Sequence, residues 1–230
     1  MADQPVFLIT GASTGIGAAT ARAAVAAGHR VVLNARSEDK LRALAGELGG
    51  DEHALVVPGD VKLWADNERM VRAALDTFGR LDVVFANAGY GGARGWLKMS
   101  PEEWEDMLLT NVLGAAYTVR AAIPALTEST GHVLITSSVA GRRALPGSFY
   151  SVTKHAVTAM GEALRQDLHD TGIRVTLIEP GMVDTPFFDQ PPEMEALHAE
   201  DIANAVLYAV SQPPRVDVNE ILIRPTAQPM

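Results

Sequence analysis

Cysteine is missing from this chain, and long hydrophobic runs are missing too. With no cysteine among 230 residues, the sequence excludes disulfide bonds, thiolate metal sites, Fe–S clusters and cysteine nucleophiles. Nowhere do about eighteen apolar residues follow one another, so we expect no membrane-spanning helix. The first residues show no basic region followed by an apolar core, and without such a signal peptide we expect a cytoplasmic protein.

Positive charge is also scarce. The chain has 19 lysines and arginines against 28 aspartates and glutamates, which gives a net charge of −9. A protein this acidic binds nucleic acids and anionic membranes poorly, so we expect neither as a partner. The six histidines form no H-x-x-x-H pair, so we expect no metal site.

What the sequence does have is a regular alternation of short apolar runs and longer helical patterns. Such alternation is typical of a parallel sheet that helices cover on both faces. We therefore expect an α/β fold, a doubly wound parallel sheet of about seven strands with helices on both faces, in one domain over residues 1–230. The expected strands are Val6–Thr10, Arg30–Leu33, Ala54–Val57, Leu81–Ala86, His132–Ser137, Ile173–Ile178 and Glu220–Ile223. The expected helices cover Gly15–Gly28, Ser37 to Gly49 and Leu63–Phe78, and two more begin at Ser100 and after Phe149.

A glycine-rich turn directly follows the first expected strand, in the segment Thr10-Gly11-Ala-Ser-Thr-Gly15-Ile-Gly17. In a doubly wound sheet, ligands bind beyond the carboxyl ends of the strands. Glycines at this position let the backbone turn tightly and approach a pyrophosphate, which the N–H groups and dipole of the next helix would bind. The segment predicts a dinucleotide site, although an ordinary strand-to-helix turn would also use glycines.

Two other motifs compete for nearby residues. Gly11-Ala-Ser13-Thr-Gly15 also matches the G-x-S-x-G elbow of serine hydrolases, with Ser13 as nucleophile and His198 as a candidate base. Little chain precedes this elbow, and such enzymes draw oxyanion donors from an earlier loop, so we disfavour this hypothesis. Ser151-x-x-Lys154 matches the S-x-x-K motif of penicillin-binding enzymes, but the partner motifs S-D-N and K-T-G are absent.

A tyrosine and a lysine share one face of the helix expected after Phe149. Tyr150 and Lys154 are separated by one helical turn, so their side chains stand side by side. A nearby ammonium group lowers the pKa of a phenol, which would make Tyr150 a general acid or base near neutral pH. The alternative is a surface tyrosine beside a solvated lysine.

Polar side chains follow two of the expected strands. Ser137 and Ser138 end one strand, and Asn87-Ala-Gly89 ends another. Asn111 lies inside a helical pattern, where an asparagine is unfavourable unless it is hydrogen-bonded. Because the carboxyl ends of parallel strands meet at one edge of a sheet, we expect these groups to converge there.

These motifs together resemble those of the short-chain dehydrogenase/reductase family in its single-domain form. The matching segments occur in the family's order and cover most of the chain. They are Thr10–Gly17, Asp60-Val61, Asn87–Gly89, Asn111, Ser138, Tyr150-x-x-x-Lys154 and Pro180–Thr185. The resemblance implies a Rossmann fold and an enzyme that interconverts a carbonyl and an alcohol with a nicotinamide cofactor.

The resemblance also implies a role for each matching residue. Tyr150 would be the general acid in carbonyl reduction and the base in alcohol oxidation, while Lys154 would bind the nicotinamide ribose and lower the pKa of Tyr150. Ser138 would orient the substrate oxygen, and it is preferred to Ser137 because Val-Ala-Gly follows it. Asn111 would hold a water that relays protons to Lys154. The residues implied in cofactor binding are Gly11, Ser13, Thr14, Gly15, Ile16, Gly17, Arg36, Ser37, Asp60, Val61, Asn87, Ala88, Gly89, Tyr150, Lys154, Pro180, Gly181, Val183 and Thr185.

The end of the second expected strand favours NADP(H) over NAD(H). NAD-binding proteins of this type place there an acid that accepts from the ribose 2′-OH. Here Ala35 stands at that position and Arg36 follows it, and a guanidinium can bind a 2′-phosphate in a bidentate manner. Ser37 and the helix that it precedes would add further donors. The alternative to an enzyme is a non-catalytic dinucleotide-binding sensor or scaffold on the same fold.

The remaining expectations concern the substrate and the assembly. Residues 186–198 would cover the site, with Phe187, Phe188, Met194 and Leu197 forming an apolar lid or simply packing. Arg94, Arg142 or Arg143 would either meet an anionic substrate or stay solvated. The C-terminal run from Val218 is similar to the subgroup of 3-hydroxy acid and clavulanate dehydrogenases. The family's habit of pairing long helices implies a homodimer or homotetramer. Ala156, Ala159, Gly161 and Ala163 would allow close contact between such helices, but they would also fit an internal core.

Overall fold

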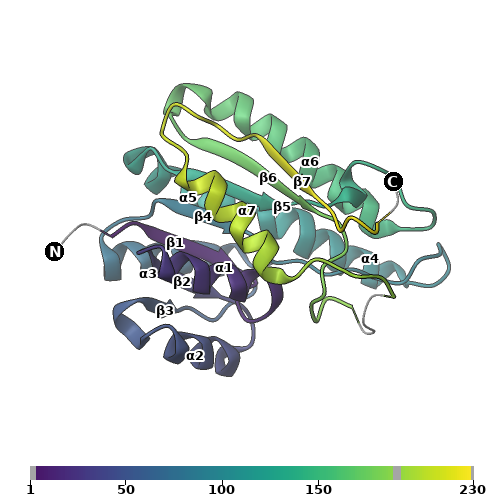
Figure 1. Ribbon diagram of the computed structural model, residues 1–230, viewed down its shortest axis with the longest axis horizontal. Helices are drawn as coiled ribbons and strands as arrows, with labels where there is room; N and C mark the ends of the chain where they lie inside the picture. Colours follow the sequence, from purple (N-terminus) through teal and green to yellow (C-terminus); the bar gives the residue numbers. More distant parts are fainter. Residues whose placement is uncertain (1–3, 189–192, 229–230) are drawn as a thin grey trace.

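The structure is a computed structural model that describes residues 4–188 and 193–228. Parallel strands form one sheet in the order β3-β2-β1-β4-β5-β6-β7 (Figure 1). They are β1 (Val6–Thr10), β2 (Arg30–Asn34), β3 (Ala54–Val56), β4 (Val83–Ala86), β5 (His132–Thr136), β6 (Arg174–Pro180) and β7 (Glu220–Ile223). The predicted α/β fold with a doubly wound, seven-stranded parallel sheet is confirmed.

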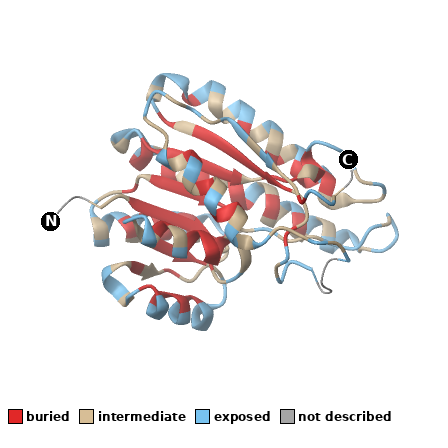
Figure 2. Ribbon diagram, viewed as in Figure 1, coloured by how far each residue is buried: buried red, intermediate tan, exposed pale blue. Residues whose placement is uncertain are grey.

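Helices cover both faces of the sheet, and each face has its own apolar core. One face packs against α1 (Gly15–Ala26), α2 (Glu38–Glu47) and α7 (Ala199–Ser211); the other packs against α3 (Trp64–Phe78), α5 (Ala115–Ser129) and α6 (Phe149–Leu168). Successive side chains of β1 alternate between the two cores, as a strand buried on both sides requires. Figure 2 shows the consequence, with buried strands at the centre and exposed outer helix surfaces.

The strand order reverses between β1 and β4, which lie side by side in the sheet. The connections that leave β1 and β4 at their carboxyl ends therefore run to opposite faces of the sheet: β1 leads into α1, and β4 leads towards α4 (Pro101–Leu108). A crevice at such a switch point is where ligands bind in open α/β sheets. The glycine turn and the Asn87–Gly89 segment both lie at this edge, because each directly follows one of the two strands.

The helix that begins at Pro101 is not α-helical throughout. Leu109–Gly114 form a π-helical turn, η2, which joins α4 directly to α5. The start of α4 is fixed by a capping box, since Glu103 N donates to Ser100 Oγ (3.2 Å) and Ser100 N donates to Glu103 Oε2 (2.6 Å). Turns of π type inside α-helices are frequent at functional sites. Short 3₁₀ turns are η1 (Gly50–Glu52), η3 (Val139–Gly141) and η4 (His169–Thr171).

Some local expectations differ from the structure. α7 is not among the expected helices; its first turn is fixed by Asp201, whose carboxylate accepts from His198 N (2.8 Å). Ser37 does precede α2, but its side chain makes no capping hydrogen bond, because the backbone at Ser37 lies outside the extended region usual for a capping residue. β6 also runs beyond the expected end, to Pro180.

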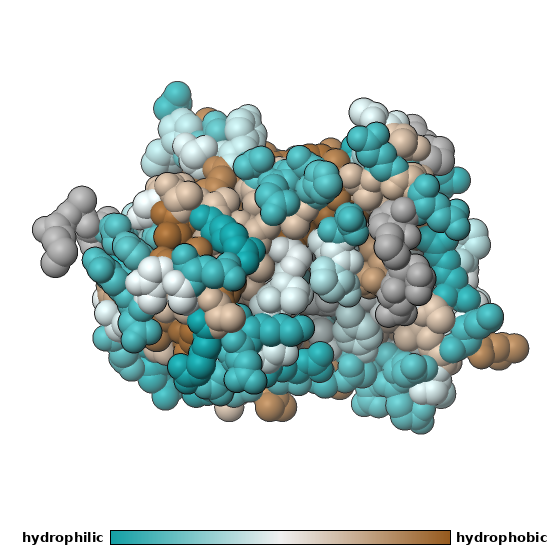
Figure 3. All heavy atoms as spheres, turned by 60° about the horizontal axis from the view of Figure 1, so that its bottom comes forward, coloured by the Kyte–Doolittle hydropathy of each residue, from teal (hydrophilic) through white to brown (hydrophobic). Residues whose placement is uncertain are grey.

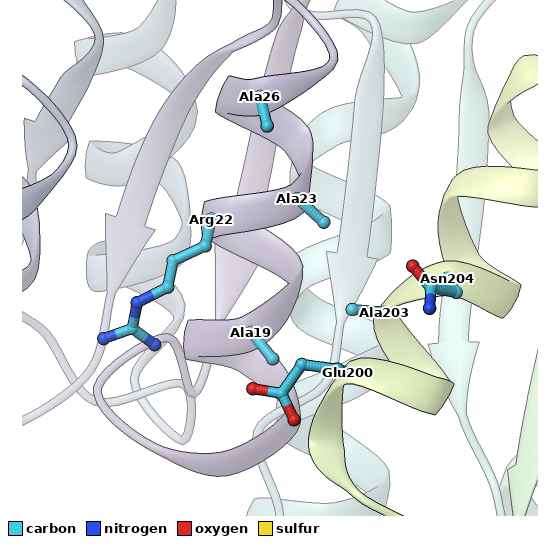
Figure 4. A pocket seen from close by; sticks show the side chains of 7 residues that line it. All are labelled: Ala19, Arg22, Ala23, Ala26, Glu200, Ala203 and Asn204. Carbon is cyan, nitrogen blue, oxygen red and sulfur yellow. The ribbon is translucent and has the colours of Figure 1, made fainter.

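The outer surface gives a shallow hollow between α1 and α7, of about 280 Å³ (Figure 4). Ala19, Ala23 and Ala203 let the two helices approach closely there, and Arg22 at its rim is paired with Glu47 of α2 (2.6 Å). Figure 3 shows that hydrophilic side chains predominate over the face that it draws. Within the described ranges, no helix combines the length and the apolar character needed to cross a membrane.

Candidate active site

Asn87 ties together the carboxyl ends of three neighbouring strands. Its backbone N–H donates to Thr10 Oγ1 (3.1 Å) and its Nδ2 donates to Thr10 O (3.1 Å). Its Oδ1 accepts from Thr136 Oγ1 (3.0 Å). Thr10 ends β1, Thr136 ends β5 and Asn87 follows β4, so hydrogen bonds among these residues fix the floor of the crevice.

The glycine turn leaves no room for side chains. A Cβ on Gly17 would lie 2.3 Å from the carbonyl oxygen of Gly11, and a Cβ on Gly11 would lie 2.9 Å from Cα of Ala88. Gly11 also has a φ of +66°, which few other residues adopt. α1 has no side-chain cap and no acid in its first turn, so no protein carboxylate there competes for its N–H groups. This cradle of bare backbone fits the pyrophosphate of a dinucleotide.

The end of the crevice beyond β2 and β3 carries the other residues implied in cofactor binding. Arg36 and Ser37 are exposed directly after β2. Val61 is buried against the π-helical turn, where a Cβ on Gly114 would lie 2.7 Å from Val61 Cγ2. Asp60 Oδ1 accepts from Lys62 N (3.0 Å), which holds the loop after β3 in a tight turn. The loops after β2 and β3 therefore carry an exposed cation at Arg36 and a buried apolar side chain at Val61.

Asn111 lies in the π-helical turn and is buried. Its Oδ1 accepts from Tyr90 N (3.0 Å), and its Nδ2 donates to Tyr90 O (2.9 Å) and to Thr153 Oγ1 (3.2 Å). A Cβ on Gly89 would lie 3.1 Å from this Oδ1 and 3.8 Å from Lys154 Nζ. Asn111 is thus hydrogen-bonded, as a buried asparagine must be, and it fixes the segment after β4 close to the lysine.

The two adjacent serines have different partners. Ser137 Oγ donates to Lys154 O (3.2 Å) and lies 2.8 Å from Thr158 Oγ1. Ser138 Oγ accepts from Ala140 N (3.1 Å) and donates to Pro180 O (3.3 Å), and it lies near enough to the Tyr150 hydroxyl to act to lower the pKa of Tyr150. Ser138 is therefore the serine that lies beside the tyrosine.

Tyr150 and Lys154 lie together, one turn apart on α6. Lys154 Nζ is 5.5 Å from the centre of the Tyr150 ring and donates to Thr136 O (2.7 Å). Burial raises the pKa of Tyr150 to about 12 and lowers the pKa of Lys154 to about 8. The expectation that Lys154 lowers the pKa of Tyr150 is not met, because desolvation of the phenolate dominates and the ammonium is bonded to a carbonyl group instead.

The loop after β6 closes over the glycine turn. A Cβ on Gly15 would lie 3.2 Å from the side chain of Thr185, which places Thr185 directly above the turn. Val183 is buried and forms a parallel bridge with Leu197. Met182 N donates to Gln228 Oε1 (2.9 Å), so a residue near the C-terminus holds this loop in place. Gln228 ends the C-terminal run that begins at Val218, but no contact or role was predicted for it.

Aromatic side chains after Thr185 lie against Tyr150. The ring centres of Phe187 and Tyr150 are 5.6 Å apart, and those of Phe187 and Phe188 are 4.9 Å apart. A Cβ on Gly91 would lie 2.8 Å from Phe187 Cζ, so Phe187 spans from the tyrosine to the loop after β4. Residues 189–192 of the expected lid lie outside the described residues.

The arginines near the crevice differ in their availability. Arg142 Nε donates to both carboxylate oxygens of the buried Glu179 (2.8 and 2.9 Å), and Arg142 also pairs with Glu220. Two carboxylates of the protein therefore pair with its guanidinium, although the side chain is 37% exposed. Arg94 and Arg143 are exposed.

A polar network at the Arg36 end has no counterpart in the sequence expectations. Asp106 of α4 accepts from Lys62 Nζ (2.6 Å) through Oδ1 and from the Tyr90 hydroxyl (2.7 Å) through Oδ2. The three residues come from three separate segments, and no motif relates their positions in the sequence. The signals that could have indicated them are that Lys62 follows Asp60-Val61 and that Tyr90 follows Gly89. In the part of the chain that the structure describes, no group of three or more histidines and carboxylates could hold a metal ion.

Comparison with known sequences gives a consistent match. The family model described as short chain dehydrogenase matches residues 5–196. An uncharacterized oxidoreductase of Staphylococcus aureus is 39% identical over 224 residues, which cover 96% of each chain. An uncharacterized oxidoreductase of Staphylococcus epidermidis is 37% identical over 226 residues, covering 96% of this chain and 97% of the relative.

Solved structures match over nearly the whole chain. An alcohol dehydrogenase from the archaeon Thermococcus sibiricus, complexed with 5-hydroxy-NADP, has a TM-score of 0.92 at 32% identity and covers 99% of both chains. The closed form of serine dehydrogenase complexed with NADP+ has a TM-score of 0.90 at 32% identity, covering 98% of this chain and 96% of that one. A 3-ketoacyl-(acyl-carrier-protein) reductase from Brucella melitensis, complexed with NADH, has a TM-score of 0.88 at 29% identity and covers 97% and 98%.

Proposed function

Because the chain belongs to the short-chain dehydrogenase/reductase family, we propose that it is an NADP(H)-dependent oxidoreductase that interconverts a carbonyl and an alcohol. The observation that carries this proposal is the placement of Ser138, Tyr150 and Lys154 together at the sheet edge where the glycine turn lies, with Lys154 Nζ 5.5 Å from the centre of the Tyr150 ring. We also propose that the chain acts as one catalytic domain, since a single sheet contains strands from Val6 to Ile223.

The nicotinamide group, when bound, would supply or accept the hydride, and the side chains of the protein would handle the proton. In reduction, the Tyr150 hydroxyl gives its proton to a carbonyl oxygen that Ser138 Oγ holds in place. A pKa of about 12 keeps Tyr150 protonated at neutral pH, which is the form that this step needs. Lys154, whose pKa of about 8 leaves it mainly charged at pH 7, is held beside the Tyr150 ring by Thr136 O and would bind the nicotinamide ribose. Asn111 positions the segment next to Lys154 and supports the proposed proton relay.

The proposed cofactor site runs along the edge of the sheet in three parts. The glycine turn from Gly11 to Gly17 would bind the pyrophosphate. Asn87–Gly89 and Pro180–Thr185, with Tyr150 and Lys154, would bind the nicotinamide half. Arg36, Ser37, Asp60 and Val61 would bind the adenosine half. Preference for NADP(H) is supported by the exposed Arg36 after β2. The structural neighbours support a nicotinamide dinucleotide of either kind, because some were solved with NADP-type cofactors and others with NADH or NAD.

Two alternatives receive less support. A non-catalytic sensor would need the glycine turn but not the contact between Ser138 and Tyr150 or the buried Lys154, and this chain has all of them. A serine hydrolase would need Ser13 free to act as a nucleophile, whereas the family match favours the proposal that the G-x-S-x-G segment is part of a dinucleotide-binding turn.

The surroundings of Tyr150 favour a substrate that is partly apolar. Phe187 packs against the tyrosine ring, and its position next to Gly91 closes one side of the crevice. Arg142 is the first arginine after Ser138 in the sequence, and it is paired with Glu179, so it is not available to bind an anionic substrate. We propose a small alcohol or carbonyl compound whose apolar part lies against Phe187.

One face of α6 suits a homodimer or homotetramer. Val152 is exposed, and Ala159 and Ala163 are exposed at helical spacing beside it. Gly161, in contrast, faces inward, since a Cβ there would lie 2.6 Å from Leu177 Cδ2. Size-exclusion chromatography with light scattering on the wild type and on Ala159→Glu would test this arrangement; equal masses for the two proteins would contradict it.

A cofactor titration is the first test of the function. The intrinsic fluorescence of NADPH and NADH is followed on titration with the wild type, and binding of either one is required. Tyr150→Phe should keep NADPH binding but lose turnover in a screen of ketones and aldehydes. Tyr208→Phe, which alters an exposed tyrosine of α7, is the matched control and should react like the wild type. Turnover by Tyr150→Phe at the wild-type rate would refute the proposed role of Tyr150.

A further inference from the structure

A hollow of about 550 Å³ opens beside Arg36, between the loop after β4 and α4. Arg36, Tyr90 and Asp106 line it, and its rim also carries Lys98, Glu102 and Glu103. Under the proposed function, Arg36 is the group that would bind a ribose 2′-phosphate. The hollow therefore places other charges close to the part of the cofactor that distinguishes NADP(H) from NAD(H).

Asp106 holds two of its neighbours by short hydrogen bonds. Its Oδ1 accepts from Lys62 Nζ (2.6 Å) and its Oδ2 accepts from the Tyr90 hydroxyl (2.7 Å). Lys62 Nζ also lies 3.6 Å from Asp60 Oδ2, so two carboxylates neutralise this ammonium. The side chain of Lys62 is 24% exposed, so solvent screens these charges only in part.

Asp106 also interacts with Arg36 through space. The positive charge of Arg36 acts to lower the pKa of both Asp106 and Tyr90, so the guanidinium and the carboxylate attract one another across the hollow. A carboxylate at this place repels any anion that approaches Arg36. It also accepts a hydrogen bond from the ammonium group of Lys62.

We propose that Asp106 is a specificity-determining residue, whose carboxylate limits the preference for a 2′-phosphate that Arg36 provides. The inference rests on the proposed function, because it concerns the same dinucleotide site. The anion opposes the extra negative charge of NADPH but has little effect on NADH, whose 2′-hydroxyl is neutral. The site thus keeps measurable affinity for both cofactors although no acid stands at the end of β2.

Asp106→Asn tests this inference, because it removes the charge while it keeps the size and one acceptor oxygen. Dissociation constants for NADPH and NADH are measured by fluorescence titration at low salt, and the readout is the ratio of the NADH constant to the NADPH constant. Loss of one charge across a solvated hollow should raise this ratio roughly three- to tenfold. The increase should shrink in 0.5 M NaCl, because salt screens the charge. Asp106→Ser, also uncharged, should raise the ratio in the same direction.

Two further variants separate charge from shape. Tyr90→Phe removes the hydrogen bond to Asp106 but no charge, and it should leave the ratio unchanged. Arg36→Ala should lower the ratio, whereas Arg143→Ala, which alters an exposed arginine elsewhere, should not. An unchanged ratio in Asp106→Asn, or an equal rise in Tyr90→Phe, overturns the inference while cofactor binding itself upholds the proposed function. If the wild type binds neither cofactor, the proposed function and this inference fail together.

Discussion

Replacement of Lys154 by methionine should change how the stability of the protein depends on pH. Lys154 is buried, and burial lowers its pKa from 10.5 to about 8. Between these values the unfolded chain binds a proton that the folded protein has lost, so the wild type becomes more stable as the pH rises. Integration of this difference from pH 7 to pH 9.5 gives a gain of about 2 kcal/mol for the wild type. Methionine has no proton to lose, so Lys154→Met should show no such gain.

Urea unfolding at several pH values, followed by circular dichroism, measures this effect. The free energy of unfolding of the wild type minus that of Lys154→Met should rise by about 2 kcal/mol between pH 7 and 9.5. The offset between the two proteins at pH 7 depends also on the carbonyl of Thr136, which loses its donor, so the pH dependence is the safer quantity. Lys40→Met, which alters an exposed lysine of α2, is the control and should show a constant offset. A constant offset for Lys154→Met as well would refute the reasoning.

Three other outcomes are expected from the same structure. The rate of alcohol oxidation should increase about tenfold per pH unit between pH 6 and 7.5, because a pKa of Tyr150 near 12 leaves only a trace of phenolate there. The rate of carbonyl reduction should not change over this range. If kcat/KM shows the same slope with pH in both directions, Tyr150 is not the general acid and base. Burial lowers the pKa of His132 to about 3, so His132 stays neutral in the folded protein. In urea titrations between pH 6 and 4.5, the free energy of unfolding of the wild type should therefore fall by about 1.4 kcal/mol per pH unit relative to that of His132→Gln. The same dependence on pH in both proteins would contradict this. Gly17→Ala should bind both NADPH and NADH more weakly, and it should lose about 1–3 kcal/mol of stability, because its Cβ would lie 2.3 Å from Gly11 O. Titration curves like those of the wild type would show that the turn tolerates a side chain.

The sheet was predictable from the sequence because its strands are short, apolar and regularly spaced. Val6–Thr10 and Glu220–Ile223 begin and end where the pattern indicated. α7 was not predicted, because its alanine-rich start follows a proline-rich segment that favours a loop. The π-helical turn was also out of reach, since one extra residue in a turn hardly alters the spacing of apolar residues in a long helix.

The candidate site was predictable as a set of residue types but not as an electrostatic environment. Helical spacing places Tyr150 next to Lys154, yet it says nothing about how far each is buried. Burial decides the pKa of both groups here, and it reverses the expected direction for the tyrosine. Asp106 and Lys62 meet only because separate segments fold against one another, so no local motif could indicate their contact.

The π-helical turn at Leu109–Gly114 makes the long helix sensitive to changes of length. Deletion of one residue would let the turn return to α-helical bonding, but each residue of an α-helix advances by about 100°, so the two sides of the deletion would rotate against each other. Either Asp106 would lose Tyr90 and Lys62, or the segment beyond Asn111 would lose its packing. The π-helical turn is therefore hard to remove, because the side chains on both sides of it have partners. Homologues that lack the extra residue are therefore expected to differ at Asp106 as well.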